Sequence, residues 1–114
     1  MDNEYVELKN LEQYIGQQVR ISGIVEEIED HGGILFLNIR DLEFFIRALV
    51  IPDKERAFSV AKNIKRGYLV DLLGLVKKSP LSSNDFLCEI EVETLAIISA
   101  RTRVANIIKI AESE

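Results

Sequence analysis

Two consecutive glycines separate two stretches in which apolar and polar residues alternate, and this pattern restricts the fold more than any other feature of the chain. Before Gly32-Gly33, a small or apolar residue recurs at every second position over residues 19–25. After the glycines, the same period of two returns over residues 34–40. Period two is typical of a strand with one buried face, and two glycines between such strands favour a tight turn. The sequence therefore predicts a β-hairpin.

Three more strands and one helix are predicted from the rest of the chain. The expected order is a strand over residues 43–51, a helix after Pro52 with Asp53 as its N-cap, and strands over residues 68–78 and 86–98. Proline ends strands because it cannot donate to the ladder, and aspartate is a common helix N-cap. The serine-rich residues 79–85 are expected to form a loop.

This order of elements indicates the fold class. Three strands, a helix and two strands follow one another in the OB-fold, a five-stranded Greek-key barrel. Gly23 and Gly74 fall in the middle of predicted strands, as expected where strands coil around a small barrel and a Cβ would be in the way. We predict an all-β fold class with accessory helices, in which the OB-fold barrel spans residues 17–100 and a helix lies between its third and fourth strands.

Helical segments are expected on both sides of the barrel. Apolar residues spaced three and four apart in residues 1–16 predict an N-terminal helical lead-in that ends at Gly16. Residues 101–114 carry a similar apolar stripe and predict a C-terminal helix. Such a helix is suited to docking on its own barrel or to a protein partner, including a second copy in a homodimer.

Composition indicates one soluble domain and limits its partners. The 114 residues are 47% hydrophobic and 29% charged, and the net charge of −5 argues against tight nonspecific binding to nucleic acid. Seven basic residues nevertheless fall within residues 40–66, so we expect one side to be locally positive. No apolar run approaches the roughly 20 residues of a membrane span, and the N-terminal residues are acidic rather than basic. We therefore expect a cytoplasmic protein that does not bind membranes.

No constellation of residues indicates catalysis. Cys88 and His31 are the single cysteine and histidine, so neither a disulfide framework nor a common zinc site is available. His31 lies near Ser22 and Asp30 in the sequence, but no partner at suitable spacing would orient it for nucleophilic chemistry. The sequence also lacks a Gly-Lys-Ser/Thr phosphate loop and a GxGxxG motif. We expect no enzymatic activity, no catalytic residue, no metal and no cofactor.

Three stretches of the chain resemble the anticodon-binding domain of the aspartyl, asparaginyl and lysyl class II tRNA synthetases. They are residues 15–19, 30–41 and 89–92, and the resemblance covers roughly residues 5–100. It implies an OB-fold module that binds tRNA or other single-stranded RNA. The catalytic domain of these enzymes would need several hundred further residues, so aminoacylation by this chain alone is excluded. The family continues into a proline-rich hinge where this chain has the predicted C-terminal helix, which favours a free-standing protein.

The resemblance implies a stacking residue at Phe36. An OB-fold binds single strands on the outer face of its second and third strands, where Phe36, Asn38 and Arg40 are predicted to lie. In the family, the position of Phe36 holds a phenylalanine that stacks on an anticodon base. A phenylalanine in the barrel core is the alternative, and Leu35 and Leu37 on the opposite face argue against it.

Two further positions are assigned by the resemblance. Glu91 corresponds to a glutamate that hydrogen-bonds the first anticodon base, because a carboxylate accepts from amino and imino groups. A solvated strand glutamate is the alternative. Arg47 stands where the family usually has a glutamine that reads the central uridine. Arginine donates hydrogen bonds but cannot accept them, so the reading of that base is expected to differ.

The acidic residues 26–29 depart from the family, which typically has several arginines before its Asp-His-Gly-Gly motif. Lys77 and Lys78, at the end of the fourth strand, are candidates to restore positive charge, although ordinary solvated lysines would look the same. The acidic run, together with outward-facing Phe45 and Leu49, leaves a second function open: a free-standing protein-interaction or assembly module that has lost RNA binding. Nucleic-acid binding is the leading prediction.

Overall fold

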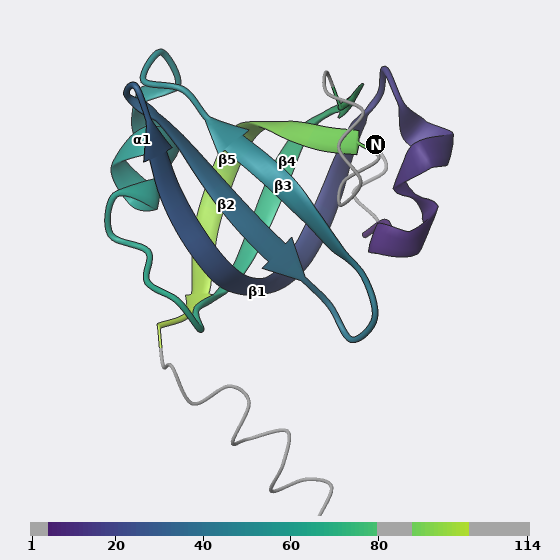
Figure 1. The fold of residues 1–114 in the computed structure, drawn as a ribbon, viewed down its shortest axis with the longest axis horizontal. Helices are drawn as coiled ribbons and strands as arrows, with labels where there is room; N and C mark the ends of the chain where they lie inside the picture. Colours follow the sequence, from purple (N-terminus) through teal and green to yellow (C-terminus); the bar gives the residue numbers. More distant parts are fainter. Residues whose placement is uncertain (1–4, 80–87, 101–114) are drawn as a thin grey trace, which may run out of the picture.

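The computed structural model describes residues 5–79 and 88–100, and in it five strands close into a barrel (Figure 1). The elements are η1 (Leu8–Tyr14), β1 (Gln18–His31), β2 (Ile34–Arg40), β3 (Phe45–Val50), α1 (Glu55–Ala61), β4 (Leu69–Lys78) and β5 (Cys88–Ser99). The order around the barrel is β1-β2-β3-β5-β4, and β1 also pairs with β4 to close the ring. Among these described strands, β3 and β5 are the parallel pair. The predicted barrel is confirmed.

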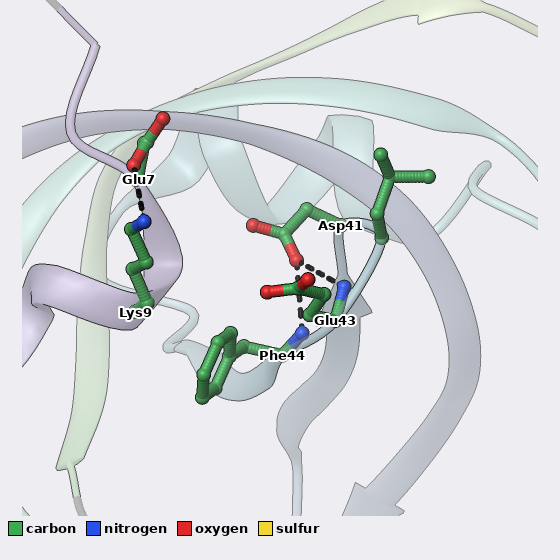
Figure 2. Close-up of a pocket in the computed structure, with 6 residues that line it drawn as sticks. Glu7, Lys9, Asp41, Glu43 and Phe44 are labelled. Carbon is green, nitrogen blue, oxygen red and sulfur yellow. Dashed lines mark hydrogen bonds and ion pairs between the residues drawn. The ribbon is translucent and has the colours of Figure 1, made fainter.

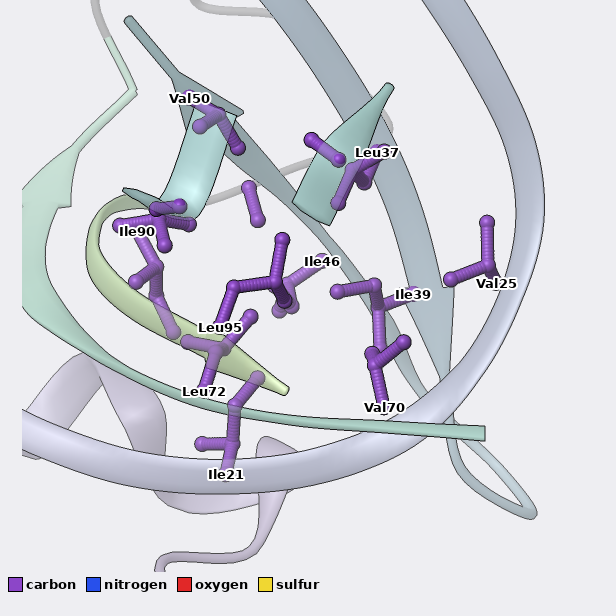
Figure 3. Close-up of a cluster of buried hydrophobic side chains, with 14 of the residues drawn as sticks. Ile21, Val25, Leu37, Ile39, Ile46, Val50, Val70, Leu72, Ile90 and Leu95 are labelled. Carbon is purple, nitrogen blue, oxygen red and sulfur yellow. The ribbon is translucent and has the colours of Figure 1, made fainter. Parts of the chain in front are cut away.

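The alternation seen in the sequence becomes the division between core and surface. In β2, Leu35, Leu37 and Ile39 are buried, whereas the side chains between them are partly exposed. The same alternation in the other strands fills the barrel with branched aliphatic side chains (Figure 3). Burying one such side chain contributes roughly 1.5–3 kcal/mol, so the core supplies the main driving force for closure. Cys88 is buried as well, and its burial raises the pKa of the thiol.

Two glycines allow strands of the barrel to approach one another closely. A Cβ on Gly23 of β1 would lie 2.7 Å from the carbonyl oxygen of Arg40 in β2. A Cβ on Gly74 of β4 would lie 2.6 Å from the carbonyl oxygen of Glu91 in β5, beside a shift in the strand register. These distances are too short for any side chain, because the obstacle is backbone. Both mid-strand glycines are therefore explained by close packing around the ring.

Several predicted boundaries are wrong, each for a local reason. Asp53 is not the helix N-cap. The amide of Lys54 donates to the carbonyl of Ile51 at 3.1 Å and closes a turn after β3. Because of this turn, α1 begins only at Glu55 and Lys54 is its N-cap. The third strand starts at Phe45, since the Asp41 side chain holds the preceding residues in a turn. The lead-in is a 3-10 helix. The predicted C-terminal helix and most of the 79–85 loop lie outside the described residues.

A buried carboxylate ties the N-terminal segment to the barrel. Asp71 of β4 accepts hydrogen bonds from Nε and Nη2 of Arg20 in β1, at 3.1 and 3.0 Å, and from the hydroxyl of Tyr5. The Arg20 guanidinium also lies 4.9 Å from the centre of the Tyr5 ring. Burial raises the pKa of Asp71, but the hydrogen bonds from Arg20 and Tyr5 outweigh it and hold this pKa below its ordinary value.

Replacing Gly74 tests the close approach of β4 and β5. Gly74→Ala should lower the free energy of unfolding by about 1–3 kcal/mol, because the new methyl group meets the backbone of Glu91 and one strand must shift. Urea unfolding followed by circular dichroism measures the change. Ser59→Ala, on the exposed side of α1, is the control and should change the stability little. Equal stability of Gly74→Ala and wild type would contradict the packing described.

The Asp71 cluster predicts a dependence of stability on pH. Because the pKa of Asp71 is lower in the folded than in the unfolded state, its contribution is present above about pH 4 and is lost as the pH falls through the folded-state pKa. Asp71→Asn should therefore be less stable than wild type near neutral pH, and the difference should shrink in acid. Unfolding curves across this range measure it, with exposed Asp53→Asn as the control. A difference that stays constant with pH would refute the assignment.

Candidate nucleic-acid interface

The predicted site residues of β2, β3 and β5 share the outer face of the barrel. In the strand register, Phe36 lies beside Leu49, and Asn38 lies beside Arg47. The parallel pairing of β3 with β5 then places Leu49 beside Glu91. Residues that are far apart in the sequence are thus gathered on one surface, where side chains are directed away from the core.

The ring of Phe36 lies on this outer surface between two polar side chains. The Arg47 guanidinium is 4.9 Å from the centre of the ring, in cation–π contact. The His31 ring meets it edge to face, with centroids 5.1 Å apart and an angle of 86° between the planes. Phe36 is half-buried by these neighbours and is not part of the core cluster. The alternative of a core phenylalanine is therefore wrong.

Arg47 is held in place by a carboxylate that the sequence analysis did not single out. Its Nε and Nη2 both donate to Oε2 of Glu89 in β5, at 3.2 and 2.8 Å. Glu89 is only 5% exposed, so this is a charged pair at the edge of the protein interior. Glu89 lies two residues before Glu91 and so shares its face of β5, but its partner Arg47 comes from β3. Only the parallel pairing of β3 and β5 reveals the contact.

The acidic end of β1 contacts the predicted site residues of β2. Glu26 forms an ion pair with Nε of Arg40, whose Nη1 also donates to the carbonyl of Asp41 at 3.0 Å. Glu27 accepts a hydrogen bond from the amide of Asn38 at 3.1 Å. The acidic residues therefore lie directly beside β2, and they neutralise or occupy groups that the sequence analysis assigned to RNA.

The cations on the β4 and β3–α1 side are also close to carboxylates of β5. Lys77 and Lys78 are exposed at the end of β4, and Nζ of Lys77 lies 3.2 Å from Oε1 of Glu91. Lys54, before α1, bonds Glu93 at 2.8 Å, and this hydrogen bond raises the pKa of Lys54. Three of the seven basic residues expected to make one side positive are thus paired with carboxylates, namely Arg40, Arg47 and Lys54.

A separate pocket lies at the turn between β2 and β3, beside η1 (Figure 2). It is lined by Glu7, Lys9, Asp41, Leu42, Glu43 and Phe44. The Asp41 carboxylate accepts hydrogen bonds from the backbone amides of Glu43 and Phe44, both at 2.9 Å, and so stabilises the turn. The pocket is at the opposite end of β2 from the Gly32-Gly33 turn. Within residues 5–79 and 88–100, no group of three metal-ligating side chains comes together.

Comparison with known proteins identifies the family of the barrel. Residues 19–98 match the family model for the tRNA anticodon type of OB-fold nucleic acid binding domain. The chain belongs to this family. As a member of the tRNA anticodon-binding OB-fold family, it carries an OB-fold nucleic acid binding domain, and the resemblance inferred from the sequence is confirmed.

Solved structures of the family's fold are similar over most of the chain. Asparaginyl-tRNA synthetase from Pyrococcus horikoshii is 28% identical, with a TM-score of 0.75 over 90% of this chain and 24% of that one. Aspartyl-tRNA synthetase from Entamoeba histolytica is 22% identical, with a TM-score of 0.75 over 86% and 22%. OBody AM3L09 bound to hen egg-white lysozyme is 18% identical, with a TM-score of 0.77 over 89% and 100%. The last two show the fold alone.

The chain spans about a quarter of the length of the synthetases that it matches. The matched part corresponds to the anticodon-binding domain and not to the catalytic domain. Among the described residues, no helix has the length and apolar character needed to cross a membrane.

Because the Glu89 carboxylate of the Arg47–Glu89 pair is buried, Arg47→Met should lower the free energy of unfolding much more than Lys77→Met. Arg47→Met leaves the buried Glu89 carboxylate without this partner and should lower the free energy of unfolding by about 3 kcal/mol. Adding Glu89→Leu should recover much of that loss, because no buried charge then remains. Lys77→Met is the matched control at an exposed pair, where less than about 1 kcal/mol is expected. Equal losses for the two methionine variants, measured by urea unfolding, would exclude the role given to Glu89.

Proposed function

We propose that this chain binds tRNA or another single-stranded RNA by stacking an unpaired base on Phe36. The observation that carries the proposal is the placement of the Phe36 ring on the outer face of β2, against Arg47. Stacking of a base on an aromatic side chain contributes roughly 1–3 kcal/mol and is available to every base. Membership of the anticodon-binding OB-fold family supports nucleic acid as the ligand class, and the synthetase neighbours support tRNA.

Base edges are the second part of the proposed recognition. Asn38 offers both a donor and an acceptor, and Glu91 offers an acceptor for amino and imino groups. Both share the face with Phe36. We propose that the positive charge that attracts RNA to this surface comes from Arg40, Lys77 and Lys78. Because Arg40 and Lys77 are already paired with carboxylates, a phosphate gains less from them than from unpaired cations. The proposed binding therefore depends more on bases than on the backbone.

The protein-interaction function remains the second candidate, and a specific observation favours it. Phe45 is 49% exposed beside Arg40, and Phe44 is 46% exposed at the adjacent turn. Apolar side chains next to charged groups are typical of protein interfaces. In this alternative, RNA would have no measurable affinity for the outer face. A partner or homodimer through residues 101–114 and a cytoplasmic location stay predictions.

Substitution of Phe36 tests the proposed function. Phe36→Ala should weaken RNA binding by roughly 5-fold to 150-fold, which corresponds to the loss of one stacked base. Fluorescence anisotropy with labelled tRNA and with unstructured RNA at low salt measures the affinity. Phe44→Ala removes an equally large exposed ring away from the proposed site and should leave the affinity unchanged. If wild type and Phe36→Ala are equally inert, the RNA-binding proposal fails and the protein-interaction alternative is favoured.

A further inference from the structure

Four side chains form a continuous row across the outer face, one from each of four strands. Glu89 of β5 accepts from Arg47 of β3, and Arg47 lies over the ring of Phe36 in β2. On the other side, the His31 ring at the end of β1 contacts Phe36. Nε2 of His31 is in turn 2.7 Å from Oε1 of Glu29. The proposed stacking ring therefore has two polar neighbours, and each neighbour is held by a carboxylate.

The two neighbours of Phe36 are not held equally. The side chain of Glu89 is 6% exposed and that of Arg47 is 23% exposed, so moving Arg47 away would leave a buried charge without its partner. The side chain of His31 is 59% exposed, and Glu29 is exposed too, so their contact is screened by water. Arg47 is therefore held firmly beside Phe36, whereas His31 can be displaced with little loss of free energy.

We propose that Glu89 is a positioning residue that keeps Arg47 against the Phe36 ring and so makes the site selective for an unpaired nucleobase over a bare phosphate chain. This inference rests on the proposed function. A guanidinium that is paired with Glu89 and lies against an aromatic ring holds that ring in one position as a stacking surface. The same guanidinium gains less from phosphate, since Glu89 already neutralises its charge and accepts from its Nε and Nη2. A base enters on the His31 side.

Glu89→Gln tests this role, because it keeps the size of the side chain and removes its charge. The probes are an oligouridylate and an abasic oligomer of the same length, which carry the same phosphates. Wild type should prefer the oligouridylate, and Glu89→Gln should reduce that preference by roughly threefold to tenfold as Arg47 leaves the ring. The released cation should also steepen the dependence of log K on log salt by up to roughly 0.7, the value for one phosphate contact to a single strand.

Glu93→Gln is the matched control. It makes the same change of charge on the same strand, but Glu93 pairs with Lys54 at 2.8 Å rather than with Arg47. It should leave the preference for the base unchanged. A readout without RNA is the ring-current shift of the Arg47 Nε proton in the NMR spectrum, which Glu89→Gln should abolish and Glu93→Gln should keep. The same spectra show that both variants are folded.

The results separate this inference from the proposed function. If Phe36→Ala weakens binding but Glu89→Gln keeps the wild-type preference for the base, the positioning role of Glu89 is overturned and RNA binding stands. The role is also overturned if Glu89→Gln and Glu93→Gln reduce that preference equally, since general charge would then explain both. If wild type binds neither oligomer, both proposals fail.

Discussion

Closure of the barrel requires β1 to pair with two strands, β2 and β4, and the rest of the structure depends on this constraint. Its first half pairs with β4 over Gln18–Ile24, and its second half pairs with β2 from Ile24 to His31. A strand can make this change only by coiling, which brings Gly23 against the backbone of β2. The β1–β2 hairpin then extends beyond the β1–β4 pairing, and it places Glu27 and Glu29 on the same outer face as Phe36.

The electrostatic character of that face follows from strand neighbours rather than from net charge. Carboxylates from β1 and β5 flank the cations of β2, β3 and β4, so each strand supplies one partner of a cross-strand pair. Exposed pairs of this kind contribute little stability, whereas the Arg47–Glu89 pair is largely removed from water. A surface built in this way attracts a polyanion weakly. On it, the Arg47 guanidinium lies 4.9 Å from the centre of the Phe36 ring.

Local patterns predicted the elements well where the backbone period alone decides the outcome. The faces of β2 were correct because successive side chains of a strand must point to opposite sides, so Leu35 and Leu37 inside required Phe36 outside. Predictions failed where a single local hydrogen-bonded turn moves a boundary. Asp41 bonds two backbone amides and delays β3, and the turn after Ile51 leaves Asp53 before the helix cap. Such contacts join residues only two or three positions apart, but residue types alone do not show whether they form.

The sequence by itself determined the order of the strands, their inner and outer faces, the positions that had to be glycine and the family to which the chain belongs. The tertiary structure alone decided which charges meet. Arg47 and Glu89 are 42 residues apart in the chain and become neighbours through the parallel pairing of β3 with β5. Alternation specifies the face of a residue but not the strand beside it, because every register that keeps the apolar face inward has the same period. The pairing of Arg47 with Glu89 beside Phe36 therefore depends on closure of the barrel.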